Sequence, residues 1–239
     1  MNIFISFSGE AREAFAIKFL NFFNKFGLHC WYDQHELFLG DILKDSIIKN
    51  GINTADYCIL IINKTYLHRN WPCEEAKLLY NHLETNKDST IFPLLVDVTK
   101  EEVKASKIDF ILSTKYQFYH AGESIDTIGF QILNRIFHDQ LTNYNTHTID
   151  EALSYFKRLT LTNSIDIFNT LNIMNNFDTT NYKDRVIILI CLINLLNKNP
   201  YLQTIKRISY YIYDNKNISY DMYKIVESIF LISVSFFRM

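Results

Sequence analysis

The chain has 239 residues, of which 48% are hydrophobic and 15% aromatic, so it can bury a core and is not a disordered polypeptide. Its formal net charge is -2 and it contains no basic run, so we expect no nucleic-acid partner. The four cysteines are scattered without a C-x-x-C pair, which predicts neither a disulfide framework nor a metal site. Because the chain starts without a leader-like segment, we expect reduced thiols and a cytoplasmic location.

Strand and helix patterns alternate in the first part of the chain. The segment 57–62 is apolar on both faces, which is typical of a central strand. Strands separated by helices favour a parallel sheet with helices on both sides, an α/β fold. The predicted strands cover residues 2–8, 29–32, 57–62, 90–96 and 116–119, and the predicted helices cover residues 11–26, 42–50, 72–83 and 124–138.

The distribution of glycine indicates a change of architecture. All six glycines lie in the first 129 residues, and glycine marks the turns of a sheet protein. We therefore expect one domain over residues 1–140 and an all-α helical domain over residues 148–239, joined by the polar stretch 142–147. The predicted helices of the second domain cover residues 149–161, 163–175, 183–197, 200–213 and 219–237.

The second domain shows no chemical motif, and we interpret it as a small helical bundle used for contact or sensing. Its longest apolar run, residues 225–237, is interrupted by Glu227 and is too short to span a bilayer. We expect no membrane partner. The run is predicted to form a buried terminal helix or an oligomer contact.

Trp71 and Glu75 are the most informative pair of residues. A spacing of four places both on one face of the helix that follows the third strand, together with Leu78 and Leu79. An acid on the apolar side of a helix is costly unless something uses it. Glu74 points about 100° away and carries no such cost. A structural alternative stays open, in which both acids only favour the start of the helix electrostatically.

The ligand site of a parallel sheet lies beyond the carboxyl ends of its strands. The glycine-rich nucleotide fingerprints G-x-G-x-x-G and G-x-x-x-x-G-K-[ST] are missing, as is the G-x-S-x-G elbow of hydrolases. A phosphoacceptor aspartate is also missing, because Asn63 follows the third strand. The residues predicted at these strand ends are Phe7, Ser8, Gly9, Asp33, Asn63 and the loop that leads to Trp71.

Four motifs occur in the order and spacing of Toll/interleukin-1 receptor (TIR) domains of plants and bacteria. Residues 3–10, Ile-Phe-Ile-Ser-Phe-Ser-Gly-Glu, resemble the first strand of that family. Residues 31–41 are similar to its second strand and BB loop, and residues 55–66 to its third strand and the loop after it. Trp71 and Glu75 match the family's tryptophan and catalytic glutamate, and residues 92–98 resemble its fourth strand. The resemblance covers residues 1–140.

The resemblance implies a flavodoxin-like five-stranded sheet and cleavage of NAD⁺ at its nicotinamide–ribose bond, with NAD⁺ as substrate and no cofactor. Glu75 would then stabilise the oxocarbenium character of the ribose. The other implied substrate contacts are Phe7 and Trp71 around the nicotinamide or ribose, Ser8 and Gly9 beside the strand end, and Asp33, Leu37 and Gly40 at the BB loop. Ser8-Gly9 replaces the basic pair that some animal members carry after the first strand, which leaves open how the phosphates are held.

Several functional alternatives follow from the resemblance. The product is ADP-ribose or a cyclic ADP-ribose. Members of the family often work as homo-oligomers, and both the TIR and the helical regions are expected to contribute contacts here. The alternative is a non-catalytic scaffold in protein–protein signalling, although such adaptors usually lack the glutamate that Glu75 matches. In a third alternative, the helical domain senses an unknown activating ligand or protein. The high Asn, Ile and Lys content, together with the resemblance to TIR domains, suggests a bacterial protein in antiviral defence.

Overall fold

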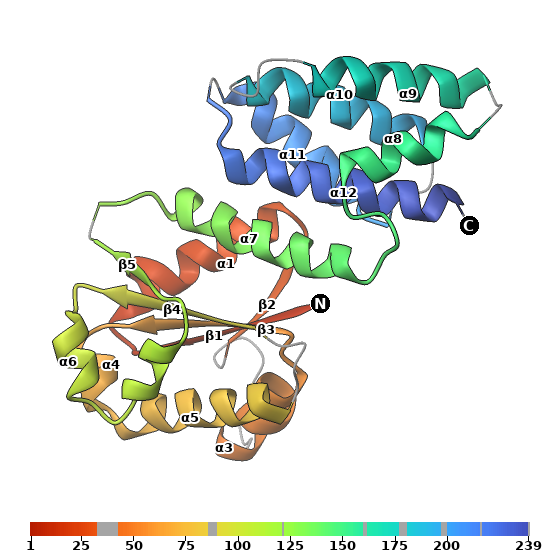
Figure 1. Cartoon of the computed structure of the whole chain (residues 1–239). Helices are drawn as coiled ribbons and strands as arrows, with labels where there is room; N and C mark the ends of the chain where they lie inside the picture. The colour runs from red at the N-terminus through yellow and green to blue at the C-terminus, as the bar shows by residue number, and fades with distance from the viewer. Residues whose placement is uncertain are drawn as a thin grey trace. The chain divides into compact units, whose positions relative to one another are not determined.

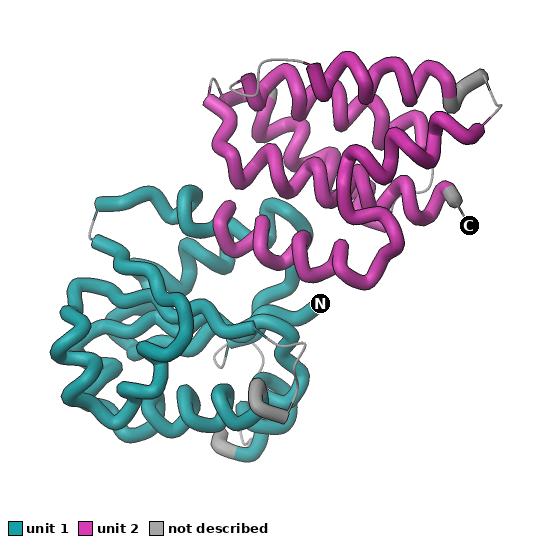
Figure 2. The backbone as a smooth tube through the Cα atoms, in the orientation of Figure 1, with its two compact units in different colours: residues 1–129 teal, residues 130–239 magenta. Residues whose placement is uncertain are grey.

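The computed structural model describes residues 1–32, 43–85, 90–120, 122–159, 162–176, 181–196, 200–215 and 217–238. The chain divides into two compact units, residues 1–129 and residues 130–239 (Figure 2). The division falls within the helix α7 (Ile125–Thr142).

The described part of the first unit contains a five-stranded sheet with the order β2-β1-β3-β4-β5, in which every pairing is parallel. All six residues of the central strand β3 are buried, which confirms the prediction made from its apolar sequence. The five-stranded parallel α/β fold is confirmed as well. The strands are β1 (Asn2–Phe7), β2 (His29–Trp31), β3 (Tyr57–Ile62), β4 (Thr90–Val96) and β5 (Gln117–Tyr119).

Helices cover both faces of this sheet. The helix α1 lies on one face, and α5 lies on the opposite face with α3 (Figure 1). Three short helices, α4, α6 and η4, were not predicted, because five residues are too few to show a helical period. The helical segments are η1 (Arg12–Ala16), α1 (Ile17–Lys25), α3 (Leu43–Ser46), η2 (Ile47–Gly51), η3 (Ile52–Thr54), α4 (Lys64–His68), α5 (Asn70–Thr85), α6 (Lys100–Lys104) and η4 (Asp109–Ser113).

Aromatic side chains fill the core on the α1 side. Phe19, Phe22, Phe23 and Phe26 are buried as their helical spacing predicts, and Gly27 ends the helix with a φ of 77°. Gly129, in the first turns of α7, lies directly against Phe22. A Cβ added at Gly129 would approach the Phe22 ring to 2.4 Å. This position therefore needs glycine for close packing.

The second unit is helical, as predicted. Its C-terminal helix α12 (Tyr220–Arg238) is almost wholly buried from Met222 to Ser235, so the apolar run forms a buried terminal helix. None of the described helices is both long and apolar enough to cross a membrane. The preceding helices are α8 (Ile149–Lys157), α9 (Thr162–Asn175), α10 (Tyr182–Leu195) and α11 (Leu202–Asp214).

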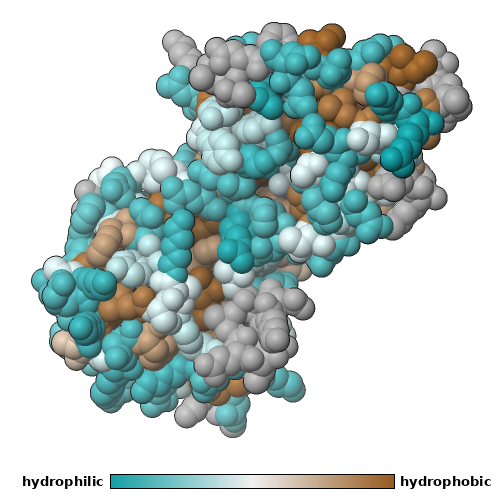
Figure 3. All heavy atoms as spheres, in the orientation of Figure 1, coloured by the Kyte–Doolittle hydropathy of each residue, from teal (hydrophilic) through white to brown (hydrophobic). Residues whose placement is uncertain are grey.

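A buried polar network links α10 to α12. The Arg185 guanidinium lies 4.8 Å from the centre of the Tyr223 ring and donates from Nη2 to the Tyr223 hydroxyl at 3.0 Å. Tyr223 in turn donates to Glu227, which also pairs with Lys224. Glu227, which interrupts the apolar run, is thus buried with partners. The outer surface of this unit carries hydrophobic patches (Figure 3), and its exposed apolar side chains include Ile165, Ile173, Ile187 and Leu195.

Candidate functional site

Glu75 lies on the buried face of α5, as its spacing from Trp71 predicts. Its exposed fraction is 7%, whereas the neighbouring Glu74 is exposed. Leu79, one turn further, is fully buried. The helix therefore buries Glu75 against the sheet and leaves Glu74 in solvent, so the two adjacent acids have different environments.

A serine of the first strand binds the Glu75 carboxylate. The Ser6 hydroxyl donates to Oε2 of Glu75 at 2.6 Å, and its oxygen lies 2.9 Å from the hydroxyl of Tyr66 in α4. A serine hydroxyl has one proton, and an ionised carboxylate can only accept. Tyr66 must then donate to Ser6, and the chain of donors runs from Tyr66 through Ser6 to Glu75. These bonds join β1, α4 and α5 around one carboxylate.

Tyr66 is suited to the donor role because it keeps its proton. Its side chain is fully buried, and this burial raises its pKa well above the ordinary value of 10. The negative charge of Glu75 raises the pKa further. The phenol is therefore neutral at physiological pH, and its proton is available to Ser6.

Further side-chain hydrogen bonds join the segment that follows β1 to α4 and its N-terminal cap. The Ser8 hydroxyl donates to Oδ1 of Asn63 at 2.8 Å, and the same atom caps α4 by accepting from the backbone N–H of Tyr66 at 2.8 Å. Thr65 donates to Glu10 from the side chain. Ser6 and Ser8 are two residues apart in extended chain, so their side chains point to the same face of the sheet. Ser6 therefore contacts Tyr66 of α4, and Ser8 contacts Asn63, the N-cap of the same helix.

The predicted substrate contacts are not all brought together. Trp71 is half-buried and packs against the hydrophobic core on the α5 side of the sheet. Ser8 is 1% exposed and engaged by Asn63, while Gly9 is exposed. Phe7 alternates to the face opposite Ser6, and its ring lies 6.2 Å from that of Tyr32. The described contacts therefore join Ser6 to Glu75 but do not join Phe7 to it.

Three predicted residues of the BB loop, Asp33, Leu37 and Gly40, lie outside the described residues. The residues that sequence reasoning missed are Ser6 and Tyr66. A signal for Ser6 was present, since a polar residue in an otherwise buried strand needs a partner. Nothing in the sequence named Glu75 as that partner.

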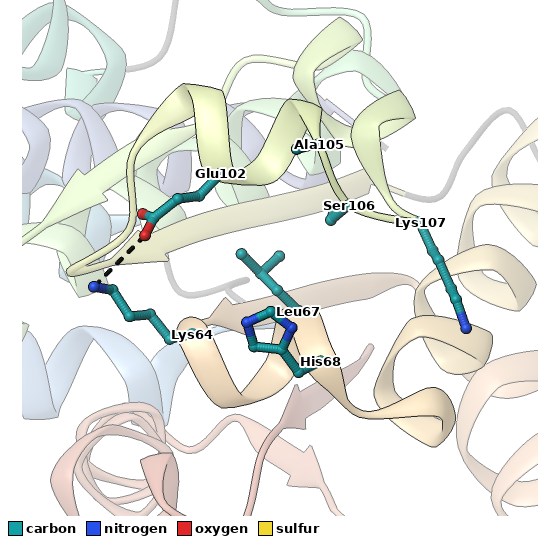
Figure 4. Close-up of a pocket in the computed structure, with 7 residues that line it drawn as sticks. All are labelled: Lys64, Leu67, His68, Glu102, Ala105, Ser106 and Lys107. Carbon is teal, nitrogen blue, oxygen red and sulfur yellow. Dashed lines mark ion pairs between the residues drawn. The ribbon is translucent and has the colours of Figure 1, made fainter.

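A pocket of about 630 Å³, lined by charged and apolar side chains, lies between α4 and α6 (Figure 4). Its two lysines already have partners. Lys64 pairs with Glu102 at 3.5 Å, and Lys107 donates to Oδ1 of Asn70 at 2.9 Å. Glu75 does not line this pocket. Within the described ranges, no group of three or more His, Cys, Asp or Glu side chains is placed to hold a metal ion.

Comparison with known proteins identifies the first unit. Three curated relatives match over part of their length. NAD(+) hydrolase TcpA of Theionarchaea archaeon is 32% identical over 105 residues, 44% of this chain and 31% of the relative. NAD(+) hydrolase TcpC of Escherichia coli is 29% identical over 128 residues, 54% of this chain and 41% of the relative. A probable 2' cyclic ADP-D-ribose synthase, TcpO of Methanobrevibacter olleyae, is 29% identical over 135 residues, 56% of this chain and 38% of the relative.

The chain thus spans less than half the length of each of these relatives. The family model described as TIR domain matches residues 3–125, just over half of the chain. That stretch contains the five described strands except for Asn2 of β1, together with the Ser6–Tyr66 pair and Glu75. The chain belongs to the TIR domain family.

Proposed function

We propose that this protein cleaves the nicotinamide–ribose bond of NAD⁺, with Glu75 as its catalytic residue. The observation that carries the proposal is the buried Glu75 carboxylate at the sheet, held by a donor chain from Ser6 and Tyr66. Burying an acid is costly, and a carboxylate so placed is typical of an active site. The names of the relatives, NAD(+) hydrolases and a cyclic ADP-ribose synthase, support the same reaction.

The chemistry requires a fixed negative charge near the reacting sugar. As the bond between ribose C1′ and the nicotinamide nitrogen breaks, its electron pair leaves with the neutral nicotinamide, and C1′ gains oxocarbenium character. A carboxylate beside the ribose stabilises this developing positive charge. Water then adds to C1′ and loses a proton, which gives ADP-ribose, or a hydroxyl of the same molecule adds and gives a cyclic product. The donor chain fixes the carboxylate before the substrate arrives, so little reorganisation is needed.

The test is nicotinamide release, measured by chromatography after incubation with NAD⁺. Glu75→Gln keeps the shape of the side chain and an oxygen that accepts from Ser6, but removes the charge. We expect turnover to fall about 10²–10³-fold. Glu74→Gln is the matched control, since it removes the same charge from the adjacent, exposed position. Equal turnover in the wild type and Glu75→Gln would refute the role of Glu75.

Assembly belongs to the same proposal. We propose that copies of this chain associate and that association activates the enzyme, as the resemblance implies. Turnover measured at increasing protein concentration would then rise faster than linearly, whereas a monomeric enzyme gives a straight line. Product analysis in the same samples separates linear from cyclic ADP-ribose. A wild type that releases no nicotinamide at any concentration would favour the scaffold alternative. The cytoplasmic location, the activating ligand and the role in antiviral defence stay predictions.

A further inference from the structure

The substrate proposed above carries a diphosphate, and the first strand does not supply the charges to bind it. Its carboxyl end continues as Ser8-Gly9, and the first basic residue after it is Arg12 in η1, whose Nε lies 3.9 Å from a Glu13 carboxylate oxygen. We propose that Arg69 forms a diphosphate-binding subsite beside Gly9. This inference rests on the proposed function and names the group that would hold the phosphates.

The fold brings Arg69 to the end of β1 from a distant part of the sequence. Arg69 follows the last residue of α4 and precedes Trp71 by two positions. A Cβ added at Gly9 would lie 3.8 Å from Nη1 of Arg69, so the guanidinium stands directly over the glycine. Because Gly9 has no side chain, nothing at this position keeps a phosphate away from the Arg69 guanidinium.

The subsite is within reach of the reacting bond. Gly9 is three residues beyond Ser6, which binds Glu75. At about 3.3 Å per residue, this places Gly9 at most about 10 Å along the chain from Ser6. A ribose with its attached diphosphate covers that span. A substrate with its nicotinamide ribose at Glu75 would therefore extend its phosphates toward Arg69.

Arg69 also has its charge available. Its side chain is exposed, and it forms no ion pair with the residues that the structure describes. The nearby acid Glu10 already accepts from Thr65. By contrast, Lys64 in the same short helix is paired with Glu102. Arg69 thus differs from Arg12, which lies 3.9 Å from Glu13, and from Lys64 in having no ion pair with the residues that the structure describes.

An arginine suits this role better than a lysine. The planar guanidinium donates two parallel hydrogen bonds to phosphate oxygens, whereas an ammonium acts as a point charge. Because the side chain is exposed, salt will screen the attraction. We expect Arg69→Gln to weaken binding of a diphosphate ligand about tenfold, and Arg69→Lys to weaken it less.

The experiment measures binding, not turnover, by calorimetry on the full chain carrying Glu75→Gln. The probes are ADP-ribose, which contains the diphosphate, and nicotinamide riboside, which contains no phosphate. Arg69→Gln is expected to weaken ADP-ribose binding about tenfold and to leave nicotinamide riboside binding unchanged. Lys64→Gln is the matched control, because it removes one positive charge from the preceding turn and should change neither affinity.

Each other outcome has a definite meaning. Failure of the parent protein to bind ADP-ribose, or equal ADP-ribose affinity in Arg69→Gln, would overturn the subsite. An equal loss for both probes would also overturn it, since it would show that Arg69 only braces the loop. If ADP-ribose binds through Arg69 but the wild type releases no nicotinamide from NAD⁺, the subsite stands and the proposed enzymatic function falls.

Discussion

Removing the Ser6 hydroxyl should lower activity, because this hydroxyl donates the hydrogen bond that holds the Glu75 carboxylate. In Ser6→Ala, the buried carboxylate loses a donor at 2.6 Å, and the Tyr66 hydroxyl loses its acceptor. A hydrogen bond to a charged group contributes about 1.5–3 kcal/mol. If this contribution serves to hold the ionised carboxylate in its reactive position, kcat should fall about 10–100-fold.

The assay follows nicotinamide release from NAD⁺ as a function of pH. A hydrogen bond to the ionised form favours ionisation, so its loss should move the acidic limb of the kcat profile to higher pH. KM should change little, because Ser6 is 1% exposed and its hydroxyl is engaged by Glu75, so we expect no direct contact between Ser6 and the substrate. Tyr66→Phe keeps the Ser6–Glu75 bond and should give a smaller effect in the same direction.

A matched control separates positioning from general stability. Ser233 in α12 is also fully buried, and its hydroxyl donates to the backbone carbonyl of Ile229 at 2.7 Å. Ser233→Ala should lower the free energy of unfolding by about 1 kcal/mol and leave kcat unchanged. If Ser6→Ala shows a similar loss of stability but keeps the wild-type kcat and pH profile, Ser6 does not position Glu75 and the reasoning is wrong.

Three further predictions concern the fold. Gly129→Ala should lower the free energy of unfolding by about 1–3 kcal/mol in urea denaturation, because the new Cβ meets the buried Phe22 ring; an unchanged midpoint would show that the ring moves freely. The backbone N–H of His147 donates to Glu151 and holds its pKa below the ordinary value of 4.5. A carboxylate whose pKa is lowered in the folded state stabilises the protein at pH values above 4.5, and this stabilisation is lost as the pH falls. The difference in the free energy of unfolding between the wild type and Glu151→Gln should therefore shrink between pH 7 and pH 3, and an increase over this range would contradict the prediction. Cys191 is exposed and the other cysteines are buried, so a maleimide should label one thiol of the native protein rapidly and none in Cys191→Ser; rapid labelling of a second thiol would contradict the buried positions.

Much of the fold can be predicted because strands and helices leave periodic patterns of apolar residues in the local sequence. The apolar run of β3 marks it as a central strand, and the spacing of the phenylalanines marks the buried face of α1. The same reasoning distinguishes Glu75 from Glu74, since a helix turns by a fixed angle per residue. The short helix α4 has no such pattern, because its start depends on the Asn63 cap and not on a repeat.

Sequence alone thus determined the alternation of strands and helices, the helical second part and the acid that faces the core. Tertiary structure alone decided which groups meet that acid. Ser6 and Glu75 are 69 residues apart in the sequence. Arg69 lies next to Gly9, although the strands β2 and β3 separate the two residues in the sequence. Periodicity reports which face a residue occupies, but contacts between distant segments depend on strand order and register, and only the assembled parallel sheet sets these.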